Sequence, residues 1–169
     1  MRLLGAVLAG GQSRRFGSDK ALALLDGRSL IEHAIAALAA QVDAVIVCGR
    51  EWGDWVPDRP EPGLGPLGGI NAALHAAAAR GFDAVLTVPC DVPGLPPDLA
   101  QRLRPPGFVE DLPVTGLWPA SLAAGLDAFL AGTQDRSMRA WTRSIGAVPL
   151  RLDVPLPNIN RPEDLEKLG

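Results

Sequence analysis

The sequence predicts an α/β sandwich built on a mostly parallel sheet. Short apolar runs at residues 3–8, 45–48 and 84–88 are apolar on both faces, which is typical of strands buried in a parallel sheet. Helical patterns separate these runs. The chain has 169 residues, of which 47% are apolar, a size that suits one domain with a substantial core. Strands that alternate with helices predict the sandwich.

The predicted elements follow in order along the chain. Ser29 and Glu32 form a capping-box pattern, so a helix should begin there and run through Ala40 with Ile31, Ile35 and Leu38 on one face. Further helices are expected at residues 69–80, 97–103, 122–130, 137–145 and 161–168. A late strand is expected at 148–152. The segment 105–119 is the hardest to assign and contains two short strand-like pairs, 108–109 and 117–118.

Composition excludes several classes of protein. The charged fraction of 21% is too low, and the apolar fraction too high, for a disordered chain. No stretch approaches the ~20 apolar residues of a membrane span, and the first apolar run is interrupted by glycines and by Arg14 and Arg15, unlike a secretory signal. Cys48 and Cys90 are too few for a disulfide scaffold. We expect a cytoplasmic monomer that binds neither membranes nor nucleic acid.

The charge is unevenly distributed. The whole chain carries −3, but residues 1–20 carry +3, because Arg2, Arg14, Arg15 and Lys20 stand against Asp19 alone. A local basic segment in an acidic chain favours a small anionic ligand such as a phosphate group. Solvated surface arginines are the alternative on charge alone.

The first strand leads into Leu8-Ala9-Gly10-Gly11, followed by Arg14, Arg15 and Lys20. Adjacent glycines let backbone amides approach a phosphate without a Cβ in the way, and the cations neutralise its oxygens. The spacing is not that of a Walker A loop. A long connection with solvated charges is the alternative interpretation.

Two proline-rich segments, 57–66 and 89–97, follow strand-like runs. Both should therefore lie at the carboxyl edge of the sheet, where open α/β folds bind ligands. Asp91 stands just beyond a buried strand, where a carboxylate suits Mg²⁺ that bridges phosphate oxygens, although an Asx turn before Pro93 is the alternative. Residues 63–68 match a dinucleotide fingerprint, but prolines rather than a strand precede them, so we interpret them as a loop of a nucleotide site.

Four motifs in order resemble those of the molybdenum cofactor guanylyltransferase (MobA) family of small-molecule nucleotidyltransferases. The first is residues 8–11 with Ser13, Arg15, Gly17 and Asp19-Lys20. The others are residues 65–70 (GPLGGI), 89–93 (PCDVP) and 158–165 (NINRPEDL). The resemblance extends from Leu3 to Leu168, nearly the whole chain.

The resemblance implies a Rossmann-like three-layer α/β/α sandwich, with residues 1–169 as a single nucleotidyltransferase domain. It implies transfer of GMP from GTP to the phosphate of molybdenum-molybdopterin, which gives molybdopterin guanine dinucleotide and pyrophosphate, with Mg²⁺ as cofactor. Molybdenum-insertion and molybdoenzyme maturation proteins are the implied protein partners. The lack of a recognisable nucleophile constellation agrees with direct transfer.

The resemblance also assigns site residues. The implied nucleotide contacts are Leu8, Ala9, Gly10, Gly11, Lys20, Asp58, Gly65, Gly69 and Asp91. Lys20, Arg15 and Asp91 are the implied catalytic residues, with Asp91 as the metal ligand. Candidate contacts of the pterin or its phosphate are Arg136, Arg139, Asn158 and Asn160.

Several of these assignments have simpler alternatives. Asp58 would serve as a turn residue before Pro60, and Asn160 as the cap of the last helix. Arg136 and Arg139 would be exposed helix residues, although a helix start with arginines also suits an anion.

Two other functions remain open from the sequence. Relatives that use CTP usually carry Leu-Ala-Ala-Gly at positions 8–11, so Gly10-Gly11 and residues 65–70 favour GTP over a cytidylyl or other nucleotidyl transfer. A non-catalytic nucleotide-binding adaptor is a further alternative, which the presence of Lys20 and Asp91 argues against. Residues 105–119 lack the histidine-proline pair that is frequent in the family and look shorter than in relatives, which leaves the pterin pocket undefined.

Overall fold

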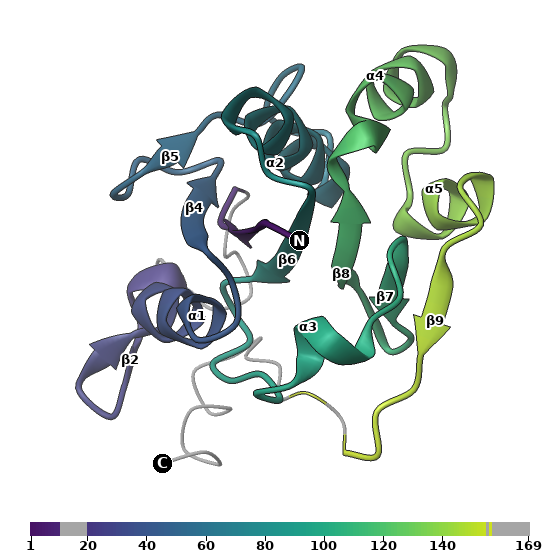
Figure 1. The fold of residues 1–169 in the computed structure, drawn as a ribbon. Helices are drawn as coiled ribbons and strands as arrows, with labels where there is room; N and C mark the ends of the chain where they lie inside the picture. The colour runs from purple at the N-terminus through teal and green to yellow at the C-terminus, as the bar shows by residue number, and fades with distance from the viewer. Residues whose placement is uncertain (11–19, 155, 157–169) are drawn as a thin grey trace.

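The computed structural model describes residues 1–10, 20–154 and 156, and its centre is a seven-stranded sheet (Figure 1). The strands are β1 (Leu3–Leu8), β4 (Ala44–Cys48), β5 (Trp55–Val56), β6 (Ala84–Pro89), β7 (Gly107–Val109), β8 (Leu112–Pro119) and β9 (Val148–Leu150). Their order across the sheet is β5-β4-β1-β6-β8-β7-β9. Only β8 pairs antiparallel with its neighbours in this sheet, so the prediction of a mostly parallel sheet is confirmed.

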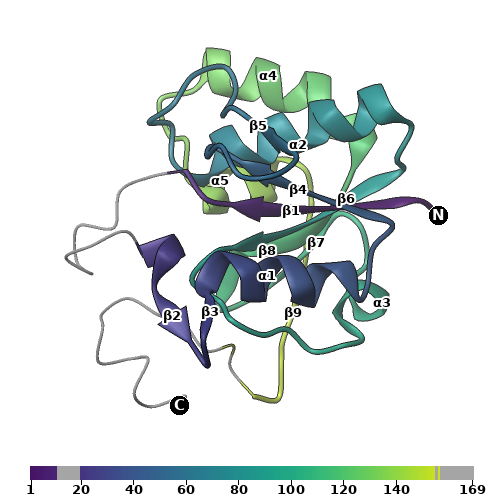
Figure 2. The same ribbon diagram turned by 90° about the vertical axis from the view of Figure 1, so that its left-hand side faces the viewer.

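Helices cover both faces of the sheet, so the fold has three layers with the sheet in the middle (Figure 2). The helices are α1 (Leu30–Ala39), α2 (Pro66–Arg80), α3 (Leu99–Arg102), α4 (Ala123–Gly132) and α5 (Met138–Ser144), with 3-10 turns η1 (Lys20–Leu22) and η2 (Ala120–Leu122). One apolar cluster joins the sheet to α2, α4 and α5, and a second joins its other face to α1 and α3. Each face of the sheet therefore has its own core.

The strand at the centre shows how closely these layers pack. All of β1 between its end residues is buried, as expected for a parallel strand with neighbours on both sides. A Cβ at Gly5 would lie 2.9 Å from Val42 Cγ2 and 3.2 Å from Leu38 Cβ. Glycine at this position therefore lets the end of α1 pack directly on the strand.

The helix boundaries confirm some predicted details and correct others. Ser29 and Glu32 form the predicted capping box at the start of α1. Helix α2 begins at Pro66, three residues earlier than expected, because proline is well suited to the first helical position. Helix α3 is shorter than expected and β9 ends at Leu150. The expected helix at 161–168 lies outside the described residues.

The segment 105–119 forms two strands, and β8 is longer than the sequence indicated. A proline and a glycine within β8 hid its extent, but Gly116 has a packing reason: a Cβ there would lie 2.3 Å from Trp118 Cζ2. Trp118 donates a hydrogen bond from Nε1 to Thr87 Oγ1 (2.9 Å), and its ring packs at a 48° tilt against Trp141 of α5, with 4.8 Å between the ring centroids. These contacts attach β8 to both β6 and α5.

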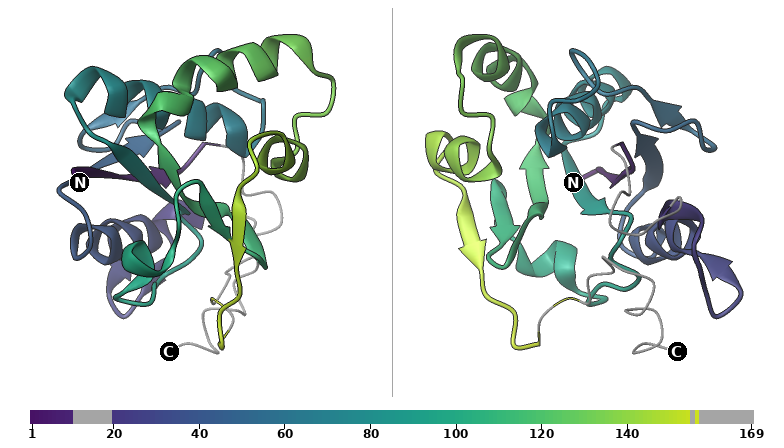
Figure 3. Two further views of the ribbon diagram at one scale, coloured as in Figure 1. Left: turned by 45° about the vertical axis from the view of Figure 1, so that its right-hand side comes forward. Right: turned by 180° about the vertical axis from the view of Figure 1, so that it is seen from behind.

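The periphery of the sheet is made of short strands. Figure 3 shows β9 along the outer edge, beyond β7. A separate hairpin of β2 (Leu24–Leu25) and β3 (Arg28–Ser29) precedes α1 and was not predicted. Within the described part of the chain, every helix is too short or too polar to cross a membrane.

Candidate active site

A cavity of ≈ 260 Å³ opens at the carboxyl edge of the sheet. Its walls include the last residues of three adjacent parallel strands, Leu8 of β1, Cys48 of β4 and Pro89 of β6. The other lining residues are Gly10, Asp58, Gly63, Gly65, Pro66, Gly69 and Val114. The cavity thus occupies the place where open α/β sheets bind ligands.

Asp58 reaches this cavity because hydrogen bonds fix the chain on both sides of it. The Gly49 amide donates to the Val56 carbonyl (2.8 Å), and the Arg59 amide donates to the Gly68 carbonyl (3.0 Å). The loop before α2 is thereby held between the end of β4 and the first turn of α2.

Glycines surround the Asp58 carboxylate. A Cβ at Gly10 would lie 2.7 Å from Oδ2, and a Cβ at Gly49 would lie 2.7 Å from Oδ1. Gly49 also has a φ of +83°, which L side chains rarely adopt. The backbone around the carboxylate is therefore closed to side chains, and its packing requires glycine.

The electrostatic environment of Asp58 is unusual for a carboxylate. Its Oδ1 is buried and accepts no hydrogen bond from any described residue. Burial raises the pKa of this carboxyl above its ordinary value. A carboxylate held in this way retains hydrogen-bonding capacity for a ligand.

Cys48 lies beside this carboxylate in the cavity wall. Burial and the neighbouring charge of Asp58 raise the pKa of the Cys48 thiol to about 12. The group therefore remains a neutral thiol near pH 7 and acts as a small apolar wall rather than as a nucleophile.

The start of α2 forms another side of the cavity. Gly65, which precedes the helix with a φ of 71°, lines the cavity together with Pro66 and Gly69. The positive end of the helix macrodipole therefore borders the cavity and favours an anionic ligand. Residues 63–68 belong to this helix start, and no strand leads directly into them.

Asp91 lies just beyond the end of β6, two residues after Pro89 of the cavity wall. The Cys90 amide donates to the Leu8 carbonyl (3.3 Å), which holds this segment beside the end of β1. Among residues 1–10, 20–154 and 156, there is no group of three His, Cys, Asp or Glu side chains that would hold a metal by itself.

The structure brings some of the expected site residues together and leaves others apart. Leu8, Gly10, Asp58, Gly65 and Gly69 line one cavity. Ala9 is buried next to it and donates to the Cys48 carbonyl (2.9 Å), and Lys20 begins η1. Gly11, Arg15, Asn158 and Asn160 lie outside the described residues.

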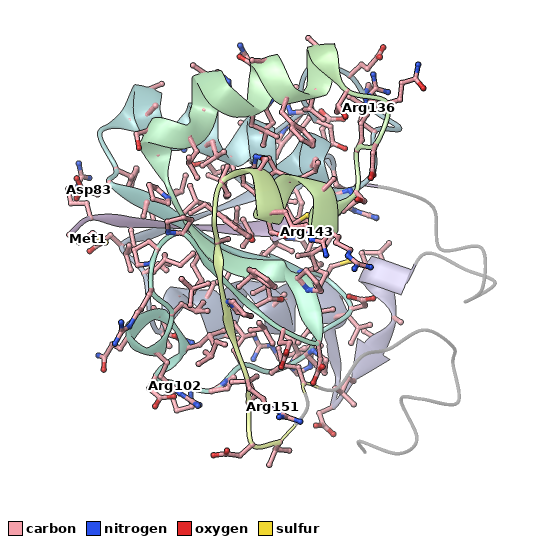
Figure 4. The ribbon with its side chains drawn as sticks, turned by 90° about the vertical axis from the view of Figure 1, so that its right-hand side faces the viewer. Met1, Asp83, Arg102, Arg136, Arg143 and Arg151 are labelled. Atoms are coloured by element: carbon pink, nitrogen blue, oxygen red, sulfur yellow. The ribbon has the colours of Figure 1, made fainter. Side chains whose placement is uncertain are left out.

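Arg136 and Arg139 line neither of the two cavities at the Asp58 loop and are both exposed. Arg136 follows α4, and its guanidinium donates to the Leu130 carbonyl of that helix (3.3 Å). Figure 4 shows Arg136 near the end of α4 and Arg143 on α5. In this arrangement the Arg136 guanidinium satisfies a carbonyl in the last turn of α4.

The sequence analysis did not identify several parts of the site. Gly49 was not singled out, and Cys48 was considered only as one of two cysteines too few for a disulfide scaffold, although a cysteine and a glycine at the end of a strand mark that edge. No local sequence pattern indicated that Val114 of the antiparallel strand β8 would line the cavity. A second cavity of ≈ 420 Å³ also borders Asp58, between residues 56–60 and α2.

Comparison with known proteins agrees with this geometry. Residues 5–148 match the family model of the MobA-like NTP transferase domain. The chain is 39% identical to a molybdenum cofactor guanylyltransferase of Rhodobacter capsulatus, covering 99% of this chain and 95% of the relative. It is 36% identical to one of Rhizobium leguminosarum, with 96% and 90% covered.

A solved structure shares the fold. The molybdopterin-guanine dinucleotide biosynthesis protein A from Archaeoglobus fulgidus superposes with a TM-score of 0.73 at 22% identity, covering 97% of this chain and 95% of that one. The sequence matches extend over almost the full chain and include the strands and loops that form the cavity. The chain therefore belongs to the MobA-like NTP transferase family and is a nucleotidyltransferase.

Proposed function

We propose that this enzyme transfers GMP from GTP to the phosphate of molybdenum-molybdopterin, with release of pyrophosphate. The names of relatives that are 39% and 36% identical over nearly the whole chain support this reaction. The observation that carries the proposal is the cavity at the carboxyl edge, with the Asp58 carboxylate in its wall and the start of α2 beside it.

Asp58 supports guanine as the base that the enzyme selects. Guanine presents two adjacent N–H donors on its Watson–Crick edge, and one carboxylate can accept both. Cytosine and adenine place a ring nitrogen acceptor beside their amino group, which would face the carboxylate unfavourably. A carboxylate whose buried Oδ1 no described residue satisfies therefore favours guanine in this cavity.

The donor set near the cavity fits a metal that binds mainly through the substrate. Asp91 is a single carboxylate, and Mg²⁺ commonly uses one or two carboxylates together with substrate phosphates and waters. Asp91 would hold this ion, which when bound would neutralise charge on the triphosphate. Nucleotidyltransferases of this family generally use a divalent metal.

The proposed chemistry requires positioning rather than a covalent intermediate. An oxygen of the pterin phosphate attacks the α-phosphorus of GTP, and the bond to the β-phosphate oxygen breaks as pyrophosphate leaves with that electron pair. Gly10 and Gly11 amides, Arg15 and Lys20 are the proposed phosphate contacts. Arg136, Arg139, Asn158 and Asn160 are the proposed contacts of the acceptor.

Calorimetric titration with GTP, CTP, ATP and NAD⁺, each with Mg²⁺, tests the nucleotide. We expect selective binding of GTP that weakens in Asp91→Ala. Pyrophosphate release with molybdopterin as acceptor then tests the reaction, and Asp91→Ala and Lys20→Ala should each reduce turnover at least about a hundredfold.

The alternatives give different results in the same titration. Preference for CTP would indicate a cytidylyl transfer in the same cavity. GTP binding without pyrophosphate release, across a series of phosphorylated acceptors, would indicate a non-catalytic adaptor. Binding of NAD⁺ alone would indicate that residues 63–68 act as a dinucleotide fingerprint.

A further inference from the structure

The Asp58 loop (residues 57–65) is held by side chains outside the cavity. The Asp58 side chain is not held through its buried Oδ1, because that atom has no hydrogen-bond partner among the described residues. Asp58 also borders both the ≈ 260 Å³ cavity and the ≈ 420 Å³ cavity. The loop therefore borders a cavity on two sides, and polar contacts outside these cavities contribute to where the carboxylate lies.

Asp127 of α4 is the centre of one such set of polar contacts. It accepts hydrogen bonds from Arg59 through Nε (3.3 Å) and a terminal nitrogen (3.2 Å). It also accepts from Asn71 Nδ2 (2.8 Å). His75 Nε2 lies 2.9 Å from its second oxygen. One carboxylate thus connects the residue after Asp58 with two positions on α2.

The same cluster reaches the backbone of the loop. Asn71 is fully buried, and its Nδ2 lies 3.4 Å from the Arg59 carbonyl as well as 2.8 Å from Asp127. The Arg59 amide is bound to the Gly68 carbonyl. Arg59 is therefore held at its amide, its carbonyl and its side chain, directly next to Asp58.

Asp127 is charged in this arrangement. The hydrogen bonds from Arg59 and Asn71 lower the pKa of its carboxyl below the ordinary value. Arg59 and Asp127 are nevertheless 49% and 37% exposed, and exposed pairs of this kind contribute little to global stability. The ionic contact is better suited to fixing a loop than to stabilising the fold.

We propose that Asp127 is a positioning residue for nucleotide selection: through Arg59 and Asn71 it fixes the Asp58 loop so that the carboxylate faces the cavity. Asp127 itself lines neither cavity. The proposal rests on the proposed function only where kinetics with GTP are measured. A second measurement, which follows the position of Asp58, needs no nucleotide.

Asp54 provides a matched control. It forms a two-point contact with Arg80 at the end of α2 that is somewhat closer than the contact of Asp127 with Arg59, with distances of 2.7 and 3.1 Å. It lines neither cavity and has no contact with the Asp58 loop among the interactions of the described residues. Asp54→Ala therefore removes a comparable ion pair without releasing Asp58.

The first readout is steady-state kinetics with GTP, or with whichever nucleotide the wild type prefers. Asp127→Ala should raise KM about tenfold or more while kcat changes less than about threefold, because the loss is one of binding geometry. Asp54→Ala should leave both constants within about twofold. Arg59→Ala should reproduce the effect, and the double variant with Asp127→Ala should add little, since both act through one contact.

The second readout is alkylation of Cys48 by iodoacetamide in the absence of nucleotide, followed by peptide mass mapping to separate Cys48 from Cys90. Asp58 contributes to the raised pKa of the Cys48 thiol, so displacement of the loop should both expose the thiol and lower its pKa. Asp127→Ala should increase the rate at least about threefold. Asp54→Ala leaves Arg80 in place, whose charge lowers the pKa of the same thiol, and should change the rate by less than about twofold because the Asp58 loop stays where it is.

Each outcome decides the proposal. Increased Cys48 alkylation in Asp127→Ala supports the positioning role even if GTP proves not to be the substrate. Cys48 rates and KM values that match those of Asp54→Ala would overturn it. If Asp127→Ala fails to fold, Asp127→Asn provides the same comparison, because it keeps the shape of the side chain and one acceptor for Asn71.

Discussion

The two proline-rich loops at the carboxyl edge are held in different ways. The Asp58 loop is attached by the partly exposed ionic cluster around Asp127. The Asp91 loop (residues 90–98) is attached by the fully buried Val92 and by the neutral side chain of Gln41. Gln41 donates to the Pro96 carbonyl (2.9 Å) and accepts from the Ala100 amide (2.9 Å).

The two loops have different proposed tasks: the Asp58 loop selects the base, and the Asp91 loop holds the metal. Charged contacts that water reaches respond to pH and salt, whereas a buried apolar side chain and an amide do not. The contact of Arg59 with Asp127 at the Asp58 loop should therefore depend on solution conditions, whereas the Val92 and Gln41 contacts of the Asp91 loop should not. Substitutions that affect one loop and spare the other test this separation.

The largest effect is expected for a substitution of Gly49, whose backbone lies against the Asp58 carboxylate. A Cβ at Gly49 would lie 2.7 Å from both Asp58 Oδ1 and Gly10 Cα, at a φ of +83°. Gly49→Ala should therefore destabilise the protein by about 2 kcal/mol or more and abolish detectable GTP binding. Urea denaturation and calorimetric titration measure the two effects.

Gly94 of the Asp91 loop is the matched control for this substitution. A Cβ there would meet nothing within 4 Å, and no left-handed backbone is required. Gly94→Ala should change the free energy of unfolding by less than about 0.5 kcal/mol. Equal tolerance of both substitutions would show that the glycine wall around Asp58 is looser than the distances indicate.

An intermediate effect is expected at Gln41. Gln41→Ala removes both hydrogen bonds of its side chain and should cost about 1–2 kcal/mol of stability, with the same cost in low and high salt. Gln41→Glu keeps the acceptor but turns a carboxylate toward the Pro96 carbonyl, so it should cost at least as much as alanine. Urea denaturation at two salt concentrations measures both; a cost that disappears in high salt would contradict a neutral anchor.

Much of the fold follows from local sequence patterns. The buried apolar runs predicted β1, β4 and β6, and the Ser29-Glu32 capping box placed the start of α1 correctly. Their parallel pairing then placed the ends of these strands, and the proline-rich loops after them, at one edge. The full length of strand β8 was not predicted, because Pro113 and Gly116 interrupt its apolar pattern. Its pairing with β6 joins residues that are distant in the sequence, so local patterns do not indicate it.

The candidate site also has parts that the sequence predicted and parts that it did not. Gly10, Asp58, Gly65 and Gly69 were all expected near a ligand, and they line one cavity. The Asp127 cluster gave no signal, because Arg59, Asn71 and Asp127 are separated by up to 68 residues and are each unremarkable locally. His75, a histidine within a helical pattern, likewise gave no sequence indication that its Nε2 lies 2.9 Å from Asp127. Contacts between distant helices of this kind become visible only in the fold.

The smallest effect concerns the pH dependence of the two carboxyls at the Asp58 loop, which should have opposite signs. Burial raises the pKa of Asp58 above its ordinary value of 3.8, so the ionised group opposes folding at neutral pH, and this cost disappears as the pH falls through the raised pKa. Hydrogen bonds lower the pKa of Asp127, so its contribution favours folding at neutral pH and is lost only as the pH falls below 3.8.

Urea denaturation of wild type, Asp58→Asn and Asp127→Asn without nucleotide measures both signs. At pH 7 we expect Asp58→Asn to be more stable than wild type, and Asp127→Asn to be less stable by about 0.2–1 kcal/mol, because its ion pair is partly exposed. On acidification the first difference should vanish at a higher pH than the second. A wild type more stable than both variants at pH 7 would mean that Asp58 is satisfied in the free protein, and the loop would then need no outside anchor.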